Sequence, residues 1–498
     1  MITPLHSVEH AAQWLLERGC RRLHSDSRRV SDGDGFIAWS GAHHDARDYV
    51  IAALDQGGQA ALVDITVQAP TSGRHWPVGV IGGLDDLKHR SGAVASAFYD
   101  HPSHALDVIA VTGTNGKTST TWWLAQALSH AQRTCGLIGT LGVGMSGQLS
   151  NTGLTTPQAV ELQTALSDMV KAGATACAAE ASSIGLAEGR LNGTRITVAV
   201  LTNFTQDHLD YHRNMEAYWQ AKRALFDWPG LRAAVINTDD PQGLRLASEL
   251  TGRMDVWTLS RQSAARLSAR DITTLPTGTQ FTVVEQGDDT RHTLATSLMG
   301  DYNVTNVLGV IASMRALGVP LAQAIESCRT LTPVPGRLHT VGGDVAQPLV
   351  LVDYAHTPDA LTQVLAALRP VAAARQGRLW CVVGCGGDRD ASKRAPMAAA
   401  AEAGADQLVL TSDNPRSEDP NAILEAMMVG LQQPARAVCV DRAHAIALAV
   451  DQADAEDVVL IAGKGHEDYQ EIQGQRLPFN DHDIALAALH ARVSGGAA

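Results

Sequence analysis

The sequence predicts an α/β protein of three domains, with boundaries near residues 105 and 335. Short apolar runs rich in β-branched residues alternate with helical stretches, which is the pattern of strands and crossover helices in parallel sheets. Several of these runs end in glycine-rich or polar loops, where ligands bind in such sheets. A length of 498 residues corresponds to roughly three domains, each large enough to bury its own core.

Residues 1–105 are predicted to form a small N-terminal α/β module. Two strands are expected, at 36–39 and 60–63, and one helix at 49–54. Hydroxyls and loop amides gather in the stretches 25–29, 33–36 and 41–44, and could hold a uracil or sugar edge. Residues of these types are also ordinary turn and cap residues, so both interpretations stay open.

The run from Val108 to Thr118 organises residues 106–335. A β-branched stretch feeds a glycine-rich turn, and the turn opens an apolar-periodic helix whose positive end favours phosphate. The loop residues are Gly113, Thr114, Asn115, Gly116, Lys117, Thr118 and Ser119. Lys117 can reach terminal phosphate oxygens and Thr118 can offer a hydroxyl to Mg²⁺. Val111 stands where the usual pattern has its first glycine, so the strand–loop–helix context carries the prediction of a P-loop-type ATPase domain; a plain turn with a solvated lysine is the alternative.

Two further strands of this domain end in polar residues, Glu180 and Asn203. The carboxyl ends of parallel strands share one edge of a sheet, so both side chains should face the loop that carries Lys117. Glu180 could then bind Mg²⁺ beside Thr118, because Mg²⁺ prefers one or two carboxylates with phosphate oxygens and water. A helix-capping acid is the alternative interpretation of Glu180.

His208 and His212 are four residues apart, which on a helix would place both imidazoles on one face. A zinc protease needs Glu after the first His, and Leu209 stands there instead, so zinc is disfavoured. Lys222 lies among apolar neighbours in an expected helix over 214–226. A buried lysine is either pKa-shifted or chemically modified, and both possibilities stay open.

Residues 336–498 are predicted to form a C-terminal Rossmann-like domain. Four apolar strands each end in a polar loop, and right-handed crossovers would place these loops on one sheet edge. Arg389, Arg416 and Glu467 would suit a zwitterion, because guanidinium grips a carboxylate and a carboxylate holds an ammonium. The run at 384–387 is only a partial dinucleotide fingerprint without an acidic ribose partner, so we do not expect NAD.

Composition excludes other classes of function. The formal charge of −13 argues against nucleic-acid binding, since nothing forms a broad basic field. Seven scattered cysteines without paired spacing fit a reduced, cytoplasmic protein. No apolar run reaches the roughly 18 residues of a membrane span, so we expect no membrane association. We expect a monomer.

The set of motifs resembles the Mur ligase family over nearly the full length of the chain. The motifs follow the family's order and lie at 112–118, 155–157, 180–183, 207–212, 335–337, 353–358, 413–416 and 463–467. The resemblance implies ATP-dependent amide formation in peptidoglycan synthesis, and so a part in cell-wall building, cell shape and cell division. The substrates it implies are ATP, a UDP-muramoyl-dipeptide and an amino acid. Asp-Asn-Pro-Arg at 413–416 marks the members that add meso-diaminopimelate.

The resemblance also implies residue roles, position by position. In the family, ATP phosphorylates the D-glutamyl γ-carboxylate. The position of Lys117, together with two Mg²⁺ ions, neutralises the charge on the phosphoryl group that is transferred. Thr118 and Glu180 match the family positions that hold one Mg²⁺. His208 and Lys222 match the positions that hold the other, and the lysine is carbamylated in the family. Positions around adenine, phosphates and ribose match Asn303, Arg337 and Asp353, besides the loop from Gly113 to Ser119. The UDP-substrate contacts match Ser25, Ser27, Ala42, His43, His44, Thr155, Thr156, Ser182, Glu188 and Arg190. The diaminopimelate pocket matches Arg389, Asp413, Asn414, Pro415, Arg416, Gly463 and Glu467.

Three positions depart from the family pattern. Ile184 replaces a histidine, Glu188 stands where a glutamine often touches substrate, and Gln206 stands where arginine is frequent. These departures concern the dipeptide contacts and not the class of reaction. Two other functions stay open: a folylpolyglutamate-type ligase, which would need neither the N-terminal module nor Asp-Asn-Pro-Arg, and a nucleotide-responsive binding protein without ligase activity.

Overall fold

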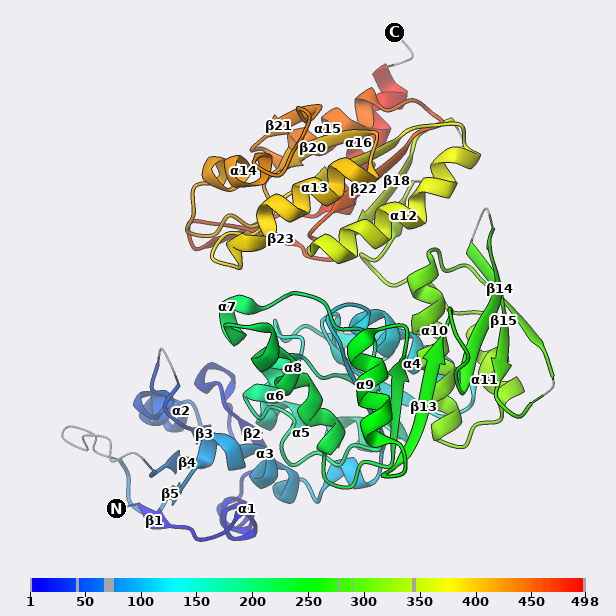
Figure 1. Cartoon of the computed structure of the whole chain (residues 1–498). Coiled ribbons are helices and arrows are strands. Elements are labelled where there is room, and N and C mark those ends of the chain that lie inside the picture. Colours follow the sequence, from blue (N-terminus) through cyan, green and yellow to red (C-terminus); the bar gives the residue numbers. More distant parts are fainter. Residues whose placement is uncertain are drawn as a thin grey trace.

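A computed structural model describes residues 2–41, 44–66, 76–275, 278–288, 290–342 and 346–495. Three large sheets follow one another along the described chain (Figure 1), and a fourth sheet of two strands lies in its C-terminal part. The N-terminal sheet is blue, the central sheet cyan to green and the C-terminal sheet yellow to red. The structure therefore confirms the predicted α/β class.

The N-terminal sheet has five parallel strands in the order β1-β5-β4-β3-β2. Its strands are β1 (Thr3–Pro4), β2 (Arg22–His24), β3 (Asp34–Ala38), β4 (Ala60–Asp64) and β5 (Ile81–Leu84). Its helices are α1 (Val8–Glu17), α2 (Val50–Asp55) and α3 (Leu87–Phe98), with short 3₁₀ turns at Ser27–Arg29, Ala46–Tyr49 and Pro102–His104. Successive residues of β3 face opposite sides, so Ile37 packs with α1 and α3 while Phe36 packs with α2.

The central sheet has eleven strands within the described residues, in the order β16-β15-β14-β13-β12-β11-β6-β10-β7-β8-β9. The strands are β6 (Asp107–Thr112), β7 (Cys135–Gly139), β8 (Gly142–Met145), β9 (Gln148–Ser150), β10 (Ala176–Glu180), β11 (Val198–Leu201), β12 (Ala233–Asn237), β13 (Asp255–Ser260), β14 (Leu267–Leu275), β15 (Gly278–Glu285) and β16 (His292–Thr296). Pairing is parallel from β14 to β7 and antiparallel at both ends. The hairpin expected at 271–296 therefore extends the main sheet.

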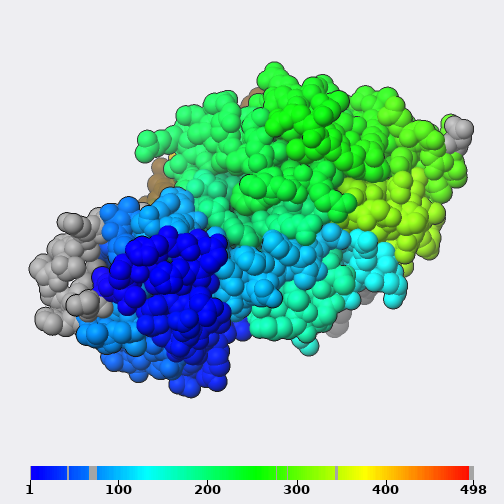
Figure 2. Space-filling view, turned by 90° about the horizontal axis from the view of Figure 1, so that it is seen from below, coloured from blue at the N-terminus to red at the C-terminus, as the bar shows by residue number. Residues whose placement is uncertain are grey.

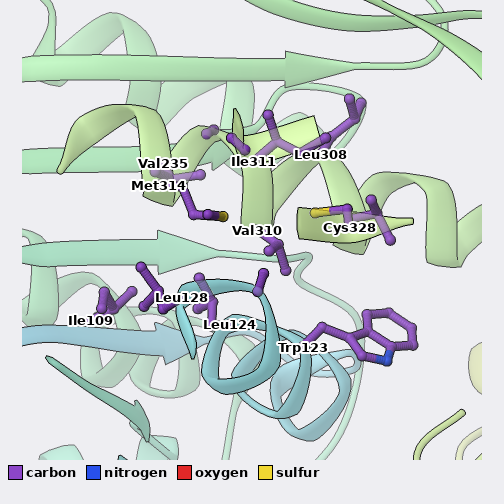
Figure 3. Packing of buried hydrophobic residues seen from close by; sticks show 14 of the residues in the cluster. Ile109, Trp123, Leu124, Leu128, Val235, Leu308, Val310, Ile311, Met314 and Cys328 are labelled. Carbon is purple, nitrogen blue, oxygen red and sulfur yellow. The ribbon is translucent and has the colours of Figure 1, made fainter. Parts of the chain in front are cut away.

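The first strand of the central domain, β6, is buried on both faces. Ile109 and Val111 contact the core under α4, α10 and α11, whereas Val108 and Ala110 contact the core under α5 and α9. Figure 3 shows the first core, where Leu124 of α4 and Leu308 of α10 lie over the sheet. The helices are α4 (Lys117–His130), α5 (Ala159–Lys171), α6 (Ser183–Ala187), α7 (Leu209–His212), α8 (Met215–Arg223), α9 (Pro241–Leu250), α10 (Asp301–Ala316) and α11 (Leu321–Cys328), with a 3₁₀ turn at Ala224–Asp227. Burying each large aliphatic side chain here contributes about 1.5–3 kcal/mol to folding.

The C-terminal sheet has the order β17-β18-β22-β19-β20-β21, with only β17 antiparallel among its described strands. The strands are β17 (His339–Val341), β18 (Leu349–Asp353), β19 (Leu379–Val383), β20 (Gln407–Thr411), β21 (Ala437–Cys439) and β22 (Val458–Ala462), and β23 (Tyr469–Ile472) pairs with β24 (Gln475–Pro478). The helices are α12 (Pro358–Ala374), α13 (Arg394–Gly404), α14 (Pro420–Met428), α15 (Arg442–Gln452) and α16 (Asp481–Gly495), with a 3₁₀ turn at Ala391–Lys393. The four predicted strands are the adjacent parallel strands β18, β22, β19 and β20, which confirms that their loops share one edge.

Contacts join the three domains. Arg22 of the N-terminal domain pairs with Asp168 of α5 at 2.6 Å, and Figure 2 shows the blue domain lying against the cyan and green surface. Asn115 of the central domain donates to Asp359 of α12 at 3.1 Å. Across the described residues, none of the helices has the length and hydropathy needed to cross a membrane.

Candidate active site

A cavity of about 890 Å³ opens between the central and C-terminal domains. Its lining comes from the loops after β6, β10 and β11 on one side and from the loops after β18, β19, β20 and β22 on the other. Lys117 and Arg416 both line it. The predicted phosphate loop and the predicted arginine pocket therefore open onto the same space.

The loop before α4 approaches its neighbours so closely that only glycine fits at two positions. Gly113 has φ +143°, and a Cβ there would overlap the Thr202 hydroxyl. Gly116 has φ +85°, and a Cβ would lie 2.6 Å from Asn306 Oδ1. Gly116 is the N-cap of α4, and no side chain in the described structure caps the helix. The amides of this helix end are available to a phosphate group.

The side chains expected at the sheet edge do meet this loop. Asn203 Oδ1 accepts from the Asn115 amide at 2.9 Å. Lys117 Nζ donates to the carbonyls of Gly113 and Thr114, each at 2.9 Å. Burial lowers the pKa of Lys117, and the nearby carboxylates of Glu180 and Asp207 oppose this shift. The Lys117 amine therefore rests on its own loop, inside the cavity.

Glu180 lies beside Thr118, as predicted. The Thr118 hydroxyl donates to Glu180 Oε2 at 3.0 Å, and the Thr140 amide donates to Oε1 at 2.8 Å. Burial raises the pKa of Glu180, although Lys117 opposes this effect. A buried carboxylate ringed by hydroxyl oxygens fits the hard oxygen ligands of Mg²⁺. The described residues contain no group of three or more His, Cys, Asp or Glu that could hold a metal, so the remaining ligands would come from substrate and water.

Lys222 of α8 reaches the same loop from the other side. Only 1% of the residue is exposed, and Nζ donates to the Gly113 carbonyl at 2.7 Å and lies 4.5 Å from the Tyr218 ring centre. Burial lowers the pKa of Lys222 well below its usual value, and the charge of Lys117 adds to this effect. A neutral, buried amine is nucleophilic, but it is not an oxygen ligand. The site would fit a second Mg²⁺ only if Nζ carried a carboxylate.

His208 precedes α7 in the left-handed conformation, with φ +54°, and the helix begins at Leu209. His208 and His212 therefore do not share a helix face. His212 instead contacts the Ser183 hydroxyl at 3.0 Å, while His208 lines the cavity. Burial lowers the pKa of His208 to about 4. The carboxylate of Asp207, whose Oδ2 lies 3.5 Å from His208 Nε2, opposes this lowering. A neutral imidazole at pH 7 can act as a ligand.

The C-terminal domain contributes to the nucleotide side of the cavity. Arg337 Nη2 lies 3.5 Å from the Thr118 hydroxyl, and its guanidinium lies 4.4 Å from the Tyr354 ring centre. Asp353 accepts from the amides of Leu338 and Ala355, and burial raises its pKa. Asn303 also lines the cavity. The predicted nucleotide residues thus come together from two domains, and all of them except Gly113 line the cavity.

Six of the predicted amino-acid-binding residues lie around the far end of the cavity. Arg416 Nη1 donates to the Gly387 carbonyl at 2.7 Å, and Nε lies 3.7 Å from Glu471. Gly463 has φ +119°, and a Cβ there would lie 2.6 Å from Asp413 Oδ2. The lining includes Arg389, Asp413, Asn414, Arg416, Gly463 and Glu467. Pro415 does not line the cavity; its carbonyl packs close to Gly387 instead.

The predicted contacts to the UDP-substrate divide into two groups. Thr155, Ser182 and Arg190 line the cavity, whereas Ser25, Ser27, His44 and Glu188 do not. The Ser25 hydroxyl and amide bond to Glu161 of α5, so it joins the N-terminal and central domains. Glu188 is held by Lys88 at 2.6 Å and by the Tyr211 hydroxyl. Ala42 and His43 lie outside the described residues.

Thr156 presents no surface to the cavity. It is fully buried, its hydroxyl donates to the Glu180 carbonyl at 2.7 Å, and Arg190 donates to its carbonyl at 3.0 Å. We expect Thr156→Val to lower the free energy of unfolding by about 1–3 kcal/mol, because a buried carbonyl loses its donor. Urea unfolding would measure this effect, with Thr155→Val as the matched control at a cavity-lining position. If Thr156→Val kept its stability but had a higher KM for substrate, the structural role of Thr156 would be contradicted.

Asp207 is a residue whose importance sequence reasoning missed. Its carboxylate lies 3.5 Å from His208, 3.8 Å from His356 and 3.9 Å from Lys393, so it links the central domain to two elements of the C-terminal domain. Burial alone would raise the pKa of Asp207, but these neighbours outweigh it and lower the pKa far below its usual range. The one signal in the sequence for a role of Asp207 was its place next to His208 in the motif at 207–212. The partners far along the chain gave none.

Comparison with known proteins gives consistent results. Residues 111–314 match the Mur ligase middle domain, and residues 336–465 match the Mur ligase glutamate ligase domain. The chain is 54% identical, over 99% of both chains, to a UDP-N-acetylmuramoyl-L-alanyl-D-glutamate–2,6-diaminopimelate ligase from Acidovorax sp. (strain JS42). A solved structure of a ligase of that name is 37% identical, with a TM-score of 0.64 and 95% of each chain covered. The MurF ligase of Thermotoga maritima with ADP shares the fold, with a TM-score of 0.67 at 18% identity over 96% of this chain and 99% of that one.

Proposed function

The chain belongs to the Mur ligase family, and from this membership we propose that it adds meso-diaminopimelate to UDP-N-acetylmuramoyl-L-alanyl-D-glutamate in an ATP-dependent reaction of peptidoglycan synthesis. The relatives named for this reaction are similar over the whole chain. The observation that carries the proposal is the single cavity lined by both Lys117 and Arg416. It joins a phosphate-binding loop to a pocket with the charges that an amino acid with a second carboxylate needs.

The chemistry proceeds in two steps. The γ-carboxylate of the D-glutamyl residue attacks the γ-phosphorus of ATP, which forms an acyl phosphate and releases ADP. The neutral amine of diaminopimelate then attacks the acyl carbon, and the tetrahedral intermediate expels inorganic phosphate and leaves the amide. The α4 amides and Lys117 hold the phosphates during the first step. The loop residues Gly113 to Ser119, with Asn303, Arg337 and Asp353, form the proposed nucleotide site.

Two Mg²⁺ sites are part of this proposal. Thr118 and Glu180 would hold one ion, and His208 with a carbamylated Lys222 would hold the other. Carbamylation joins the neutral Nζ to CO₂ and releases a proton, so a buried amine becomes an oxygen ligand. Bound Mg²⁺ supplies positive charge that offsets the charge of the phosphoryl group. The low pKa of Lys222 supports the modification, because only the neutral amine reacts with CO₂.

The division of labour among the domains follows from the same proposal. Residues 1–105 would bind the uridine end, residues 106–335 would bind ATP, and residues 336–498 would bind the amino acid. Thr155, Ser182 and Arg190 would contact the muramoyl-dipeptide from the cavity wall. All seven cysteines are free, which supports a reducing, cytoplasmic setting. A monomer stays part of the prediction.

We expect the protein to release phosphate from ATP and Mg²⁺ only when the UDP-muramoyl-dipeptide and meso-diaminopimelate are both present. With L-lysine in place of meso-diaminopimelate, kcat/KM should fall at least about tenfold, because an arginine pocket built for a second carboxylate is left unpaired. A coupled phosphate assay measures both rates. Lys117→Met serves as the control for contaminating phosphatase and should abolish release.

The same assay separates the other functions. Phosphate release that needs a folate and glutamate instead would identify a folylpolyglutamate-type ligase. ATP binding without release under any combination would leave a nucleotide-responsive binding protein. Either result would remove the proposed ligase function.

A further inference from the structure

A buried lysine next to the amino-acid pocket has no role in the reaction described so far. Lys464 follows Gly463 in the loop after β22, and none of its surface is exposed. Its Nζ donates to Asn414 Oδ1 at 3.0 Å and to Glu467 Oε2 at 2.8 Å. A charge without access to water is costly unless it is paired and hydrogen-bonded, so this contact shapes its surroundings.

Lys464 fixes which way the Asn414 amide points. Asn414 Oδ1 accepts from both Lys464 and the Glu471 amide, and Nδ2 donates to Glu467 Oε2 at 2.8 Å. If the Asn414 amide were reversed, its NH₂ group would face the Lys464 ammonium and the Glu471 amide. All of these groups are donors, so neither Lys464 nor Glu471 would have an acceptor there. Only the orientation with Nδ2 toward Glu467 satisfies all the groups.

This arrangement leaves one oxygen of Glu467 for a ligand. Oε2 receives donors from Lys464 and Asn414, whereas Oε1 has no hydrogen-bond partner among the described residues. Glu467 and Arg416 both line the cavity. The pocket thus offers a single carboxylate oxygen and a guanidinium to an incoming amino acid.

We propose that Lys464 is a positioning residue for amino-acid recognition: through Asn414 and Glu467 Oε2 it aims Glu467 Oε1 at the ammonium of the amino-acid centre that does not react. The proposal rests on the proposed function, because it takes the ligand to be an amino acid with a second, distal zwitterionic centre. Lys464 itself does not touch the ligand. It acts by holding the carboxylate that does.

The test is steady-state kinetics of Lys464→Met, which keeps the length of the side chain and removes the charge and donors. We expect the KM for meso-diaminopimelate to rise about tenfold, which corresponds to 1.4 kcal/mol, while kcat and the KM for ATP stay within twofold. With 2-aminopimelate, which lacks the distal ammonium, the variant and the wild type should have the same KM. Lys171→Met on the exposed end of α5 controls for the substitution and should change nothing.

Two outcomes for Lys464→Met would overturn the proposal. A rise in KM of equal size for both amino acids would overturn it, because Lys464 would then support the fold in general. An unchanged KM for meso-diaminopimelate in a folded Lys464→Met protein would also overturn it. If that variant does not fold, Asn414→Leu removes the second donor to Glu467 and must show the same selective rise. Absence of phosphate release in the wild type would remove the proposed function itself, which these comparisons distinguish from a failure of Lys464 alone.

Discussion

Lys222→Ala is expected to lower kcat for phosphate release by about 10²–10³-fold, the size of effect seen when one group that stabilises transition-state charge is removed. Lys222 Nζ lies against the Gly113 carbonyl, under the loop that would hold the phosphates. If Nζ carries a carboxylate in the active enzyme, its loss removes negative charge and a metal ligand together. High concentrations of formate or acetate should restore part of the activity, because a small carboxylate can enter the space that the side chain leaves.

The matched control for Lys222→Ala is Gln220→Ala. Gln220 lies on the same helix, α8, is exposed, and its side chain donates to Glu216 one turn away. It should keep the wild-type kcat. If Lys222→Ala also kept it, Lys222 would have no part in the reaction. Loss of activity that no carboxylate restores would favour a purely structural role for the bond to Gly113.

Local patterns in the sequence were enough to predict the centre of the fold. The β-branched run before Gly113 predicted a buried strand, and the rule for parallel sheets predicted that Glu180 and Asn203 would meet the loop. Both contacts are present, through Thr118 and Asn115. These inferences succeeded because they need only the direction of neighbouring strands, which the crossover rule fixes.

Features that depend on partners far along the chain escaped prediction. Ser25 is held by Glu161, Asp207 by His356 and Lys393, and Lys464 by Asn414. The residues of each pair are separated by 50 to 186 positions, and a single sequence carries no signal for such pairing. The bare spacing of His208 and His212 suggested a shared helix face, but the left-handed residue before α7 prevents it.

Glu188, one of the departures from the family pattern, has partners of its own in the structure. Glu188 stands where a glutamine often touches substrate in the family, so a carboxylate replaces a neutral amide there. In the structure Glu188 is not among the residues that line the cavity, and it is held by Lys88 and the Tyr211 hydroxyl. These contacts outweigh burial and lower the pKa of Glu188, so its charge is already balanced before substrate arrives.

Arg416→Ala is expected to lower the preference for meso-diaminopimelate over lysine by about 10–100-fold in kcat/KM, because hydrogen bonds to a charged group contribute about 1.5–3 kcal/mol. The Gly387 carbonyl and Glu471 hold the guanidinium at the cavity. Competition assays with both amino acids would measure the ratio. The matched control is Arg436→Ala, which should keep the ratio. Arg436 is exposed and comes directly before β21, the edge strand of the same domain's sheet.

The backbone at Arg416 makes this substitution easy to interpret. Arg416 has φ +51°, a left-handed conformation that costs alanine about as much as arginine, so the substitution adds no new strain. A glycine there would relax the backbone and confuse the result. Arg416→Lys keeps the charge without the planar fork that grips a carboxylate, so it should recover only part of the preference. A folded Arg416→Ala protein with unchanged preference would mean that Arg389 alone recognises the second carboxylate, and the role proposed for Arg416 would be wrong.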